Sequence, residues 1–277
     1  IFMCFHLNIP PAFFYIIPLF GKHENRKFIK IFPLCISQWW IWFDEPSAGM
    51  PHFVRLYKNA VTIPSETTQK LSEAARENSI YVCISVTEKD HASLYLTQLW
   101  FNPSGDLIGK HRKLKPSGAE RYIWGEGDAS MMPVFDTQIG RLGGLECWEH
   151  MVPANMMAMM NKNEQIHVQS WPSCFPQPEH LFSNYPLETG AKAYSIINQV
   201  YSVVSSQIYT EEMRDMVCTN DKQRAIMSPG YGMTMIIDPS GHTIAKLLFN
   251  IYGNLMTEFG DYFYGIHSTN FFHQNLF

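Results

Sequence analysis

The clearest periodic pattern lies in the first half of the chain. Between Ser65 and Asn78, apolar residues recur at the three- and four-residue spacing of an amphipathic helix, and Ser65 or Thr67 can cap its start. The next segment, SIYVCISVTE (79–88), alternates apolar and polar positions, which is typical of a strand. The pattern therefore predicts a helix over 65–78 that is followed directly by a strand.

Two turns of nearly identical sequence separate strand-like runs far apart in the chain. The first is Asn102-Pro103-Ser104-Gly105 (102–105), and the second is Asp238-Pro239-Ser240-Gly241 (238–241). Proline presets the backbone for a turn, and glycine accepts a positive φ. The similarity indicates either two similar halves of one β-rich core or repeated use of a common turn, and the sequence leaves both open.

A third change of pattern occurs around Cys147. The segment GRLGGLE (140–146) leads into this cysteine, and the methionine-rich stretch 151–160 is predicted to be a helix that packs in the core, with Pro153 in its first turn. The segment QIHVQSW (165–171) follows as a short buried strand. Repeated alternation of strands and helices favours the α/β class, with Cys147 where a strand turns into a helix.

Composition excludes several classes of function. A chain of 277 residues with a net charge of −4 suits one large or two small α/β domains, and it argues against nucleic-acid partners or an anionic membrane. The six cysteines lie far apart without a CxxC pair, which favours free thiols in the reducing cytoplasm. The histidines show no metal-ligand spacing, so we expect no metal site.

The segment 111–128 holds the candidate chemistry together with Cys147. It offers Lys113 and Lys115 as cations and Glu120, Glu126 and Asp128 as acids, interleaved with apolar residues that indicate partial burial. A solvated loop is the simpler interpretation, but a buried lysine beside a buried glutamate is costly unless the two pair or act on a substrate. A cysteine at a helix start near a cation can be a reactive thiolate, so Cys147 is a candidate nucleophile, although most cysteines in such turns are not catalytic.

Three motifs give these residues a common context: HRKLKPSGAERYIWGEGD (111–128), GRLGGLECWEHM (140–151) and EQIHVQSWPS (164–173). They resemble the signatures of the nitrilase family of carbon–nitrogen hydrolases, and the resemblance runs from about residue 39 to about residue 248. Trp148-Glu149-His150 after the cysteine is similar to the nitrilase and cyanide hydratase branch rather than to the amidases. The resemblance implies a four-layer α-β-β-α sandwich and a homo-oligomer, either a dimer or larger.

The resemblance also implies roles for individual residues. Cys147 would attack the nitrile carbon, Lys113 would stabilise the tetrahedral intermediate, and Glu120 matches a second glutamate of the family. A thioimidate and then a thioester would form, and a carboxylic acid and ammonia would be released without a cofactor. The residues expected around the substrate and the oxyanion are Trp148, Glu149, His150 and Trp171. For the motif histidines His111, His150 and His167, supporting roles are expected rather than catalysis.

One acid of the family is absent from its expected place. The family's general base is a glutamate in an FPE-type motif, and the comparable stretch here is KIFPLCISQWWIW (30–42). Alignment on Phe-Pro places Leu34 at that position, and alignment on the tryptophans places Ile31 there; Glu24 and Glu45 are off register. The alternatives are therefore a nitrilase, a cyanide hydratase that stops at the amide, and an inactive subunit that assembles with active ones.

Both ends differ from the family pattern within an expected single domain over 1–277. The first twenty residues are apolar, but prolines interrupt them and they lack the basic start of a signal peptide, so neither a signal nor a membrane span is expected. Residues 1–30 show no recognisable first strand, and 249–277 show no closing strand. We hypothesise that both ends are translated non-coding or frame-shifted sequence, which a transcript with the same ends would contradict.

Overall fold

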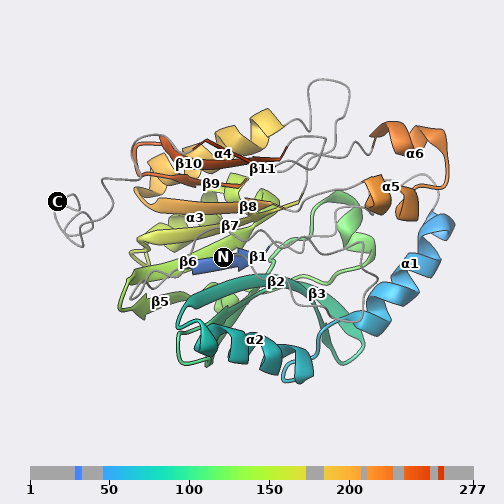
Figure 1. Cartoon of the computed structure of the whole chain (residues 1–277), viewed down its shortest axis with the longest axis horizontal. Coiled ribbons are helices and arrows are strands. Elements are labelled where there is room, and N and C mark those ends of the chain that lie inside the picture. Colours follow the sequence, from blue (N-terminus) through green and yellow to red (C-terminus); the bar gives the residue numbers. More distant parts are fainter. Residues whose placement is uncertain are drawn as a thin grey trace.

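The computed structural model describes residues 29–32, 46–172, 184–206, 211–226, 234–249 and 255–258. Two β-sheets face each other, and helices cover their outer sides (Figure 1). In the described residues, the first sheet has the order β1-β2-β3-β4 and the second has the order β11-β10-β9-β8-β7-β6-β5. No helix in these residues is both long enough and apolar enough to span a membrane.

The elements have the following bounds. The first sheet consists of β1 (Ile29–Phe32), β2 (Tyr81–Asp90), β3 (Ser93–Phe101) and β4 (Leu107–Arg112). The second consists of β5 (Val134–Thr137), β6 (Gly140–Glu146), β7 (Ile166–Trp171), β8 (Tyr201–Ser206), β9 (Thr234–Ile237), β10 (Thr243–Phe249) and β11 (Leu255–Glu258). The α-helices are α1 (Pro46–Asn59), α2 (Glu66–Glu77), α3 (Pro153–Met160), α4 (Asn184–Asn198), α5 (Glu211–Val217) and α6 (Asp221–Ile226). The 3₁₀ turns are η3 (Gly118–Tyr122), η4 (Ala129–Met131) and η5 (Cys147–Met151).

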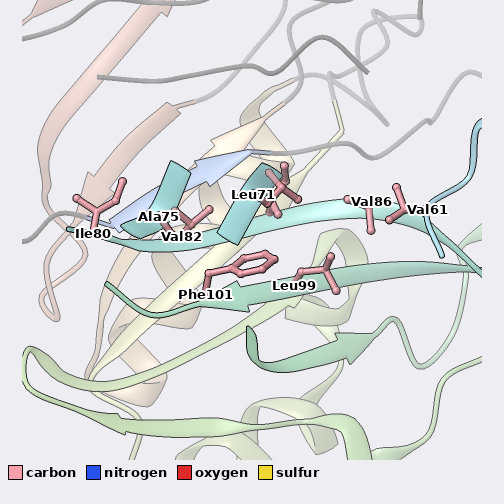
Figure 2. Packing of buried hydrophobic residues seen from close by; sticks show 9 residues of the cluster. Val61, Leu71, Ala75, Ile80, Val82, Val86, Leu99 and Phe101 are labelled. Carbon is pink, nitrogen blue, oxygen red and sulfur yellow. The ribbon is translucent and has the colours of Figure 1, made fainter. Parts of the chain in front are cut away.

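Helix α2 forms the outer layer on the first sheet. Ser65 is its N-cap, and the Ser65 and Thr68 side chains accept hydrogen bonds reciprocally from each other's backbone N–H groups. Leu71 and Ala75 on its inner side pack with β2 and β3 residues such as Val82 (Figure 2). The helix and the following strand predicted from the sequence are thus confirmed.

The inner faces of the two sheets pack directly on each other. Cys83 and Trp100 of the first sheet are buried in one cluster with Leu142 and Val168 of the second. Gly144 on β6 permits this close approach, because a Cβ there would lie 2.7 Å from Oε1 of Gln98 and 2.9 Å from the Val168 carbonyl oxygen.

Helices α3 and α4 form the outer layer on the second sheet. Met159 of α3 and Tyr194 of α4 are buried with Leu145 of β6, and Ala191 of α4 packs with Val204 of β8. The four layers are therefore α-β-β-α, as the family resemblance implied. The expectation of core packing holds for Met159, whereas Met157 is 63% exposed because it lies on the other side of α3.

The two similar turns occupy equivalent places, one in each sheet. Gly105 joins β3 to β4 at φ +88°, and Gly241 joins β9 to β10 at φ +83°. In both turns the first side chain accepts two backbone hydrogen bonds at 2.9 Å: Oδ1 of Asn102 in one and Oδ1 of Asp238 in the other. This equivalence supports the interpretation of two similar halves.

Neither a first strand nor a closing strand was expected from the sequence, and this expectation is wrong. Strand β1 pairs in parallel with β2, with Ile31 opposite Cys83, and β11 pairs antiparallel with β10. Both strands have four residues, which is too short for an alternation pattern to stand out. Their pairing depends on the unpaired backbone groups that β2 and β10 offer at their edges.

Candidate active site

Cys147 lies at the predicted junction, directly after β6 and at the start of η5. Its φ of +54° is in the left-handed region, which is uncommon and strained for a residue other than glycine. The side chain is buried with Trp171 and Leu187. A sharp strand-to-helix turn therefore presents this thiol, and the strain indicates a functional position.

Lys113 and Glu120 form a buried ion pair close to this cysteine. Lys113 follows β4, and its Nζ lies 2.6 Å from Oε2 of Glu120 in η3. The same carboxylate oxygen accepts a hydrogen bond from the Ser117 N–H at 2.6 Å. Both charges act on the Cys147 thiol. The structure thus brings together the three residues that the sequence predicted to be catalytic.

The groups around the Cys147 thiol shift its pKa in opposite directions. Burial raises the pKa of Cys147 to about 11, and the carboxylates of Glu120 and Glu146 act in the same direction. The Lys113 charge and a hydrogen bond from the Trp148 N–H lower the pKa of this thiol. The thiol is therefore protonated at neutral pH, and nucleophilic attack requires a group that accepts its proton.

Glu146 is a buried acid at the site that sequence reasoning missed. It precedes Cys147, and its Oε2 has no hydrogen-bond partner in the part of the chain that the structure describes. Burial raises the pKa of Glu146 to about 7, although the charges of His111 and Lys113 oppose this shift. The two-residue alternation along β6 from Leu142 places Glu146 on the inner face of the sheet, and this was the available signal.

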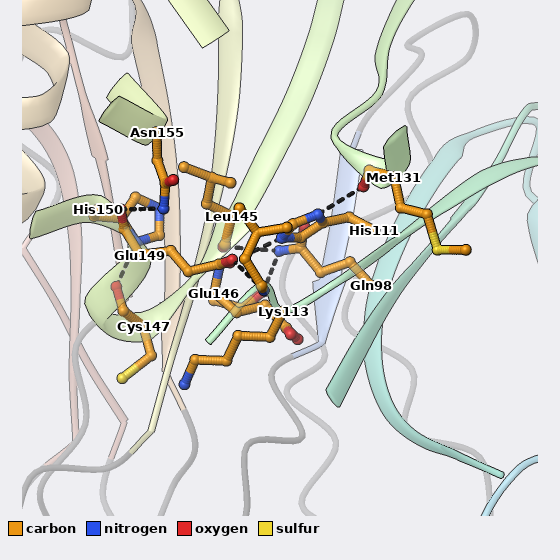
Figure 3. A network of polar contacts seen from close by, with 12 residues as sticks. Gln98, His111, Lys113, Met131, Leu145, Glu146, Cys147, Glu149, His150 and Asn155 are labelled. Atoms are coloured by element: carbon orange, nitrogen blue, oxygen red, sulfur yellow. Dashed lines mark hydrogen bonds and ion pairs between the residues drawn. The ribbon is translucent and has the colours of Figure 1, made fainter. Parts of the chain in front are cut away.

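Glu149 ties the cysteine turn to the strand that leads to Lys113. Its carboxylate accepts hydrogen bonds at 2.8 Å from Nε2 of His111 and from the backbone N–H groups of Leu114 and Glu146. Figure 3 shows Glu149 beside His111 and Glu146, with the ends of the Lys113 and Cys147 side chains toward the same side of the network. The carboxylate oxygens are therefore engaged within the protein.

The other residues expected around the substrate lie in different environments. Trp148 is 46% exposed, whereas His150 and Trp171 are fully buried and stacked on each other with ring centroids 5.0 Å apart. Their assignment to a substrate pocket, like that of Glu149, stays a prediction.

The position expected for the general base falls partly outside the described residues. The backbone of Ile31 lies within β1, and Leu34, Glu24 and Glu45 fall outside. Over the described ranges, no group of three or more His, Cys, Asp and Glu side chains is placed to hold a metal ion.

Comparisons with known proteins agree with this architecture. The sequence profile of the carbon–nitrogen hydrolase family matches residues 33–253. A nitrilase of Bacillus sp. (strain OxB-1) is 56% identical over 210 residues, which cover 76% of this chain and 62% of that protein. A cyanide hydratase of Microdochium sorghi is 33% identical over 217 residues, which cover 75% of this chain and 59% of that protein. The chain thus spans about three fifths of the length of these relatives.

A solved structure supports the fold independently. The crystal structure of a carbon–nitrogen hydrolase from Helicobacter pylori G27 superimposes with a TM-score of 0.62 at 16% identity, covering 83% of this chain and 75% of that one. The α-β-β-α layers agree with that fold, and the profile match over residues 33–253 shows that the chain belongs to the carbon–nitrogen hydrolase family.

Proposed function

We propose that this chain hydrolyses organic nitriles to carboxylic acids and ammonia, with Cys147 as the nucleophile. The observation that carries the proposal is the buried Lys113–Glu120 ion pair acting on a cysteine at a strained strand-to-helix turn. The 56% identity to a protein named nitrilase, of which the chain covers 62%, supports a nitrile as the substrate.

The reaction follows from these groups. A base removes the Cys147 proton, and the thiolate adds to the C≡N carbon to give a thioimidate. Water then adds, ammonia leaves and a thioester remains, and a second water molecule releases the carboxylic acid. Lys113 and the Trp148 N–H, which already donates to the sulfur, stabilise the charge that develops. One such donor contributes about 10²–10³ in rate.

The proton acceptor is the part of the mechanism with more than one candidate. The described carboxylates that act on Cys147 are Glu120 and Glu146. Glu120 is held by Lys113 and the Ser117 N–H, whereas Oε2 of Glu146 has no hydrogen-bond partner in the described residues. We assign activation of the thiol to one of these two carboxylates, in place of the glutamate that the sequence lacks near Ile31 and Leu34.

Two alternatives have support of their own. The protein of Microdochium sorghi, 33% identical, is named a cyanide hydratase, which favours an amide product from cyanide. The thiol pKa of about 11, together with the missing glutamate, favours a catalytically inactive subunit.

We also propose a single domain, a homo-oligomer and a cytoplasmic location. The exposed apolar side chains of Met157 on α3 and of Ile196 and Ile197 on α4 support an interface between copies, because these helices form one outer layer. The described cysteines Cys83 and Cys147 are free thiols, which supports a reducing compartment.

The decisive experiment measures the products formed from a panel of small nitriles and from cyanide. Ammonia is assayed for nitrile hydrolysis, and formamide for hydration of cyanide. The Cys147→Ala variant is expected to be inactive, and Cys218→Ala is the matched control because it removes another buried cysteine side chain. Ammonia from the parent and from the control alone supports the nitrilase proposal, and formamide alone supports the hydratase. Absence of both products from a folded parent would favour the inactive subunit.

A further inference from the structure

Four buried polar side chains form a continuous line from α4 to the main chain of Cys147, and none of them enters the proposed reaction. Each is less than 9% exposed. The contacts are Tyr194 Oη to Glu164 Oε2 (3.1 Å), Glu164 Oε1 to His167 Nδ1 (2.6 Å), His167 Nε2 to His150 Nε2 (3.0 Å) and His150 Nδ1 to the Cys147 carbonyl oxygen (2.7 Å).

The last contact fixes the direction of every hydrogen bond in the line. A carbonyl oxygen only accepts, so the proton between His150 and Cys147 lies on Nδ1 of His150. A neutral histidine carries one N–H, so Nε2 of His150 is an acceptor and Nε2 of His167 must donate to it. Nδ1 of His167 is then an acceptor too, and its contact with Oε1 of Glu164 requires a proton on the carboxyl group.

We propose that Glu164 is a neutral carboxylic acid, and that the one-directional chain from Tyr194 through Glu164, His167 and His150 positions the nucleophile through the Cys147 carbonyl oxygen. The inference rests on the proposed function only for the role of Cys147. Glu164, His167 and His150 are positioning residues, because they act on the reacting sulfur through the backbone that carries it.

The electrostatic environment agrees with the neutral chain. Burial raises the pKa of Glu164 well above its ordinary value, and burial lowers the pKa of His150 and of His167 well below theirs. The charged residues that face the two rings are His111 and Glu149, and their effects on each ring have opposite signs. An ionised Glu164 beside a protonated His167 would contain the same number of protons, but it would bury two charges away from water.

Aromatic packing holds the rings in place. The His167 ring stacks on Tyr194 with centroids 4.0 Å apart, and the His150 ring stacks on Trp171 at 5.0 Å. Gly143 on β6 makes room for the acid, because a Cβ at this position would overlap the Glu164 carboxyl group. The packing around these hydrogen-bonded side chains therefore disfavours any other set of hydrogen-bond partners.

This rigid row of hydrogen bonds holds the backbone of Cys147 in place. Cys147 has a left-handed backbone conformation that a cysteine disfavours by itself, so the surrounding structure must impose it. The bond from His150 restrains the peptide that follows the nucleophile, and the N–H of that same peptide, at Trp148, donates to the sulfur. The chain thus orients the thiol and the backbone donor together.

The test compares two substitutions of Glu164 in the full chain. Glu164→Gln keeps an N–H donor for His167 and an oxygen acceptor for Tyr194, so it imitates the neutral acid. Glu164→Leu has a similar size without either group. The rate of Cys147 alkylation by iodoacetamide is followed over pH by mass spectrometry of its peptide, with Cys218 as the internal control, alongside thermal unfolding and nitrile turnover.

If these hydrogen-bonded side chains are neutral, Glu164→Gln should unfold near the parent temperature. Its Cys147 should be alkylated within about threefold of the parent rate, with the same pH profile. In Glu164→Leu, alkylation and kcat should fall about 10- to 100-fold while KM changes less, because the nucleophile is misplaced by a fraction of an ångström.

Two results would overturn the inference. A Glu164→Gln variant that loses stability and reactivity would show that Glu164 is ionised, and this result decides the matter even if the Leu variant does not fold. A folded Glu164→Leu variant with parental alkylation would show that Cys147 does not depend on the chain. If alkylation responds as expected but the parent turns over no nitrile, the positioning inference stands and the proposed function fails.

Discussion

Nε2 of His111 lies 2.8 Å from Oε2 of Glu149, and this buried contact joins the two sheets beside the candidate active site. His111 is on β4 of the first sheet, and Glu149 is in η5 after β6 of the second. Lys113 is two residues after His111, and Cys147 is two residues before Glu149. The contact therefore sets the relative position of cation and nucleophile.

The His111–Glu149 pair predicts a specific dependence of stability on pH. Burial lowers the pKa of His111, but the charge and hydrogen bond of Glu149, the Glu146 charge and the hydrogen bond to the Met131 carbonyl together outweigh burial and raise the pKa from 6.5 to about 9 in the folded state. The contribution of the pair is therefore fully present below pH 6.5 and is lost as the pH rises through about 9. A shift of this size corresponds to about 3 kcal/mol of unfolding free energy.

Urea unfolding of the parent and of Glu149→Gln between pH 6 and pH 10 tests this dependence. The variant should be less stable than the parent at pH 6 by about 3–5 kcal/mol, since it leaves a buried partner unpaired. The difference should shrink toward pH 10. A difference that stays constant over this range would contradict the assignment of the titration to this pair.

Lys113 and Lys115 provide a matched pair of variants for the role of the active-site cation. Lys113→Gln should reduce kcat about 10²–10³-fold, because it removes the charge that we propose stabilises the intermediate. Lys115 forms an exposed ion pair with Glu126, and an exposed pair contributes little, so Lys115→Gln should leave both turnover and stability near the parent values.

Steady-state kinetics on the best nitrile, with thermal unfolding as a check of folding, distinguishes the two lysine variants. Equal losses of kcat would place the effect in the charge of the whole segment and not at Nζ of Lys113. If the parent is inactive, alkylation of Cys147 replaces turnover, and Lys113→Gln should slow it because the Lys113 charge lowers the pKa of the thiol.

Gly144→Ala tests the packing between the sheets. Its Cβ would lie 2.7 Å from Oε1 of Gln98 and 2.9 Å from the Val168 carbonyl oxygen, so the sheets must move apart. We expect a loss of about 1–3 kcal/mol in unfolding free energy, the usual cost of overpacking. Gly125→Ala is the control, because the nearest atom there is a Tyr95 ring carbon at 3.1 Å; an equal effect of both variants would contradict the argument.

Local patterns in the sequence were enough to predict the elements that depend on local interactions. Ser65 could be predicted as the N-cap of helix α2 because the capping hydrogen bonds lie within four residues of sequence. The turns at Gly105 and Gly241 follow from residue types that suit a positive φ. The position of Cys147 between β6 and η5 was readable for the same reason.

Contacts between distant segments were not readable in this way. Glu164 and Tyr194 are 30 residues apart in the sequence, and nothing in the pattern around either residue indicates that the fold places both beside His167. Glu146 has an ordinary place at the end of a strand, and only its orientation between two sheets makes it unusual. The pairing of β1 and β11 likewise depends on edges that other strands provide.

Lys113 follows a strand of one sheet and Cys147 follows a strand of the other. The packing of the two sheets therefore sets the position of the cation relative to the thiol. A small slide between the sheets changes the distance between cation and thiol before it opens the core. Conservative substitutions at remote interior positions such as Leu142→Met should therefore slow reaction of the Cys147 thiol more than their small cost in stability would suggest. We therefore expect the reactivity of Cys147 to be the most sensitive measure of how well the two sheets fit together.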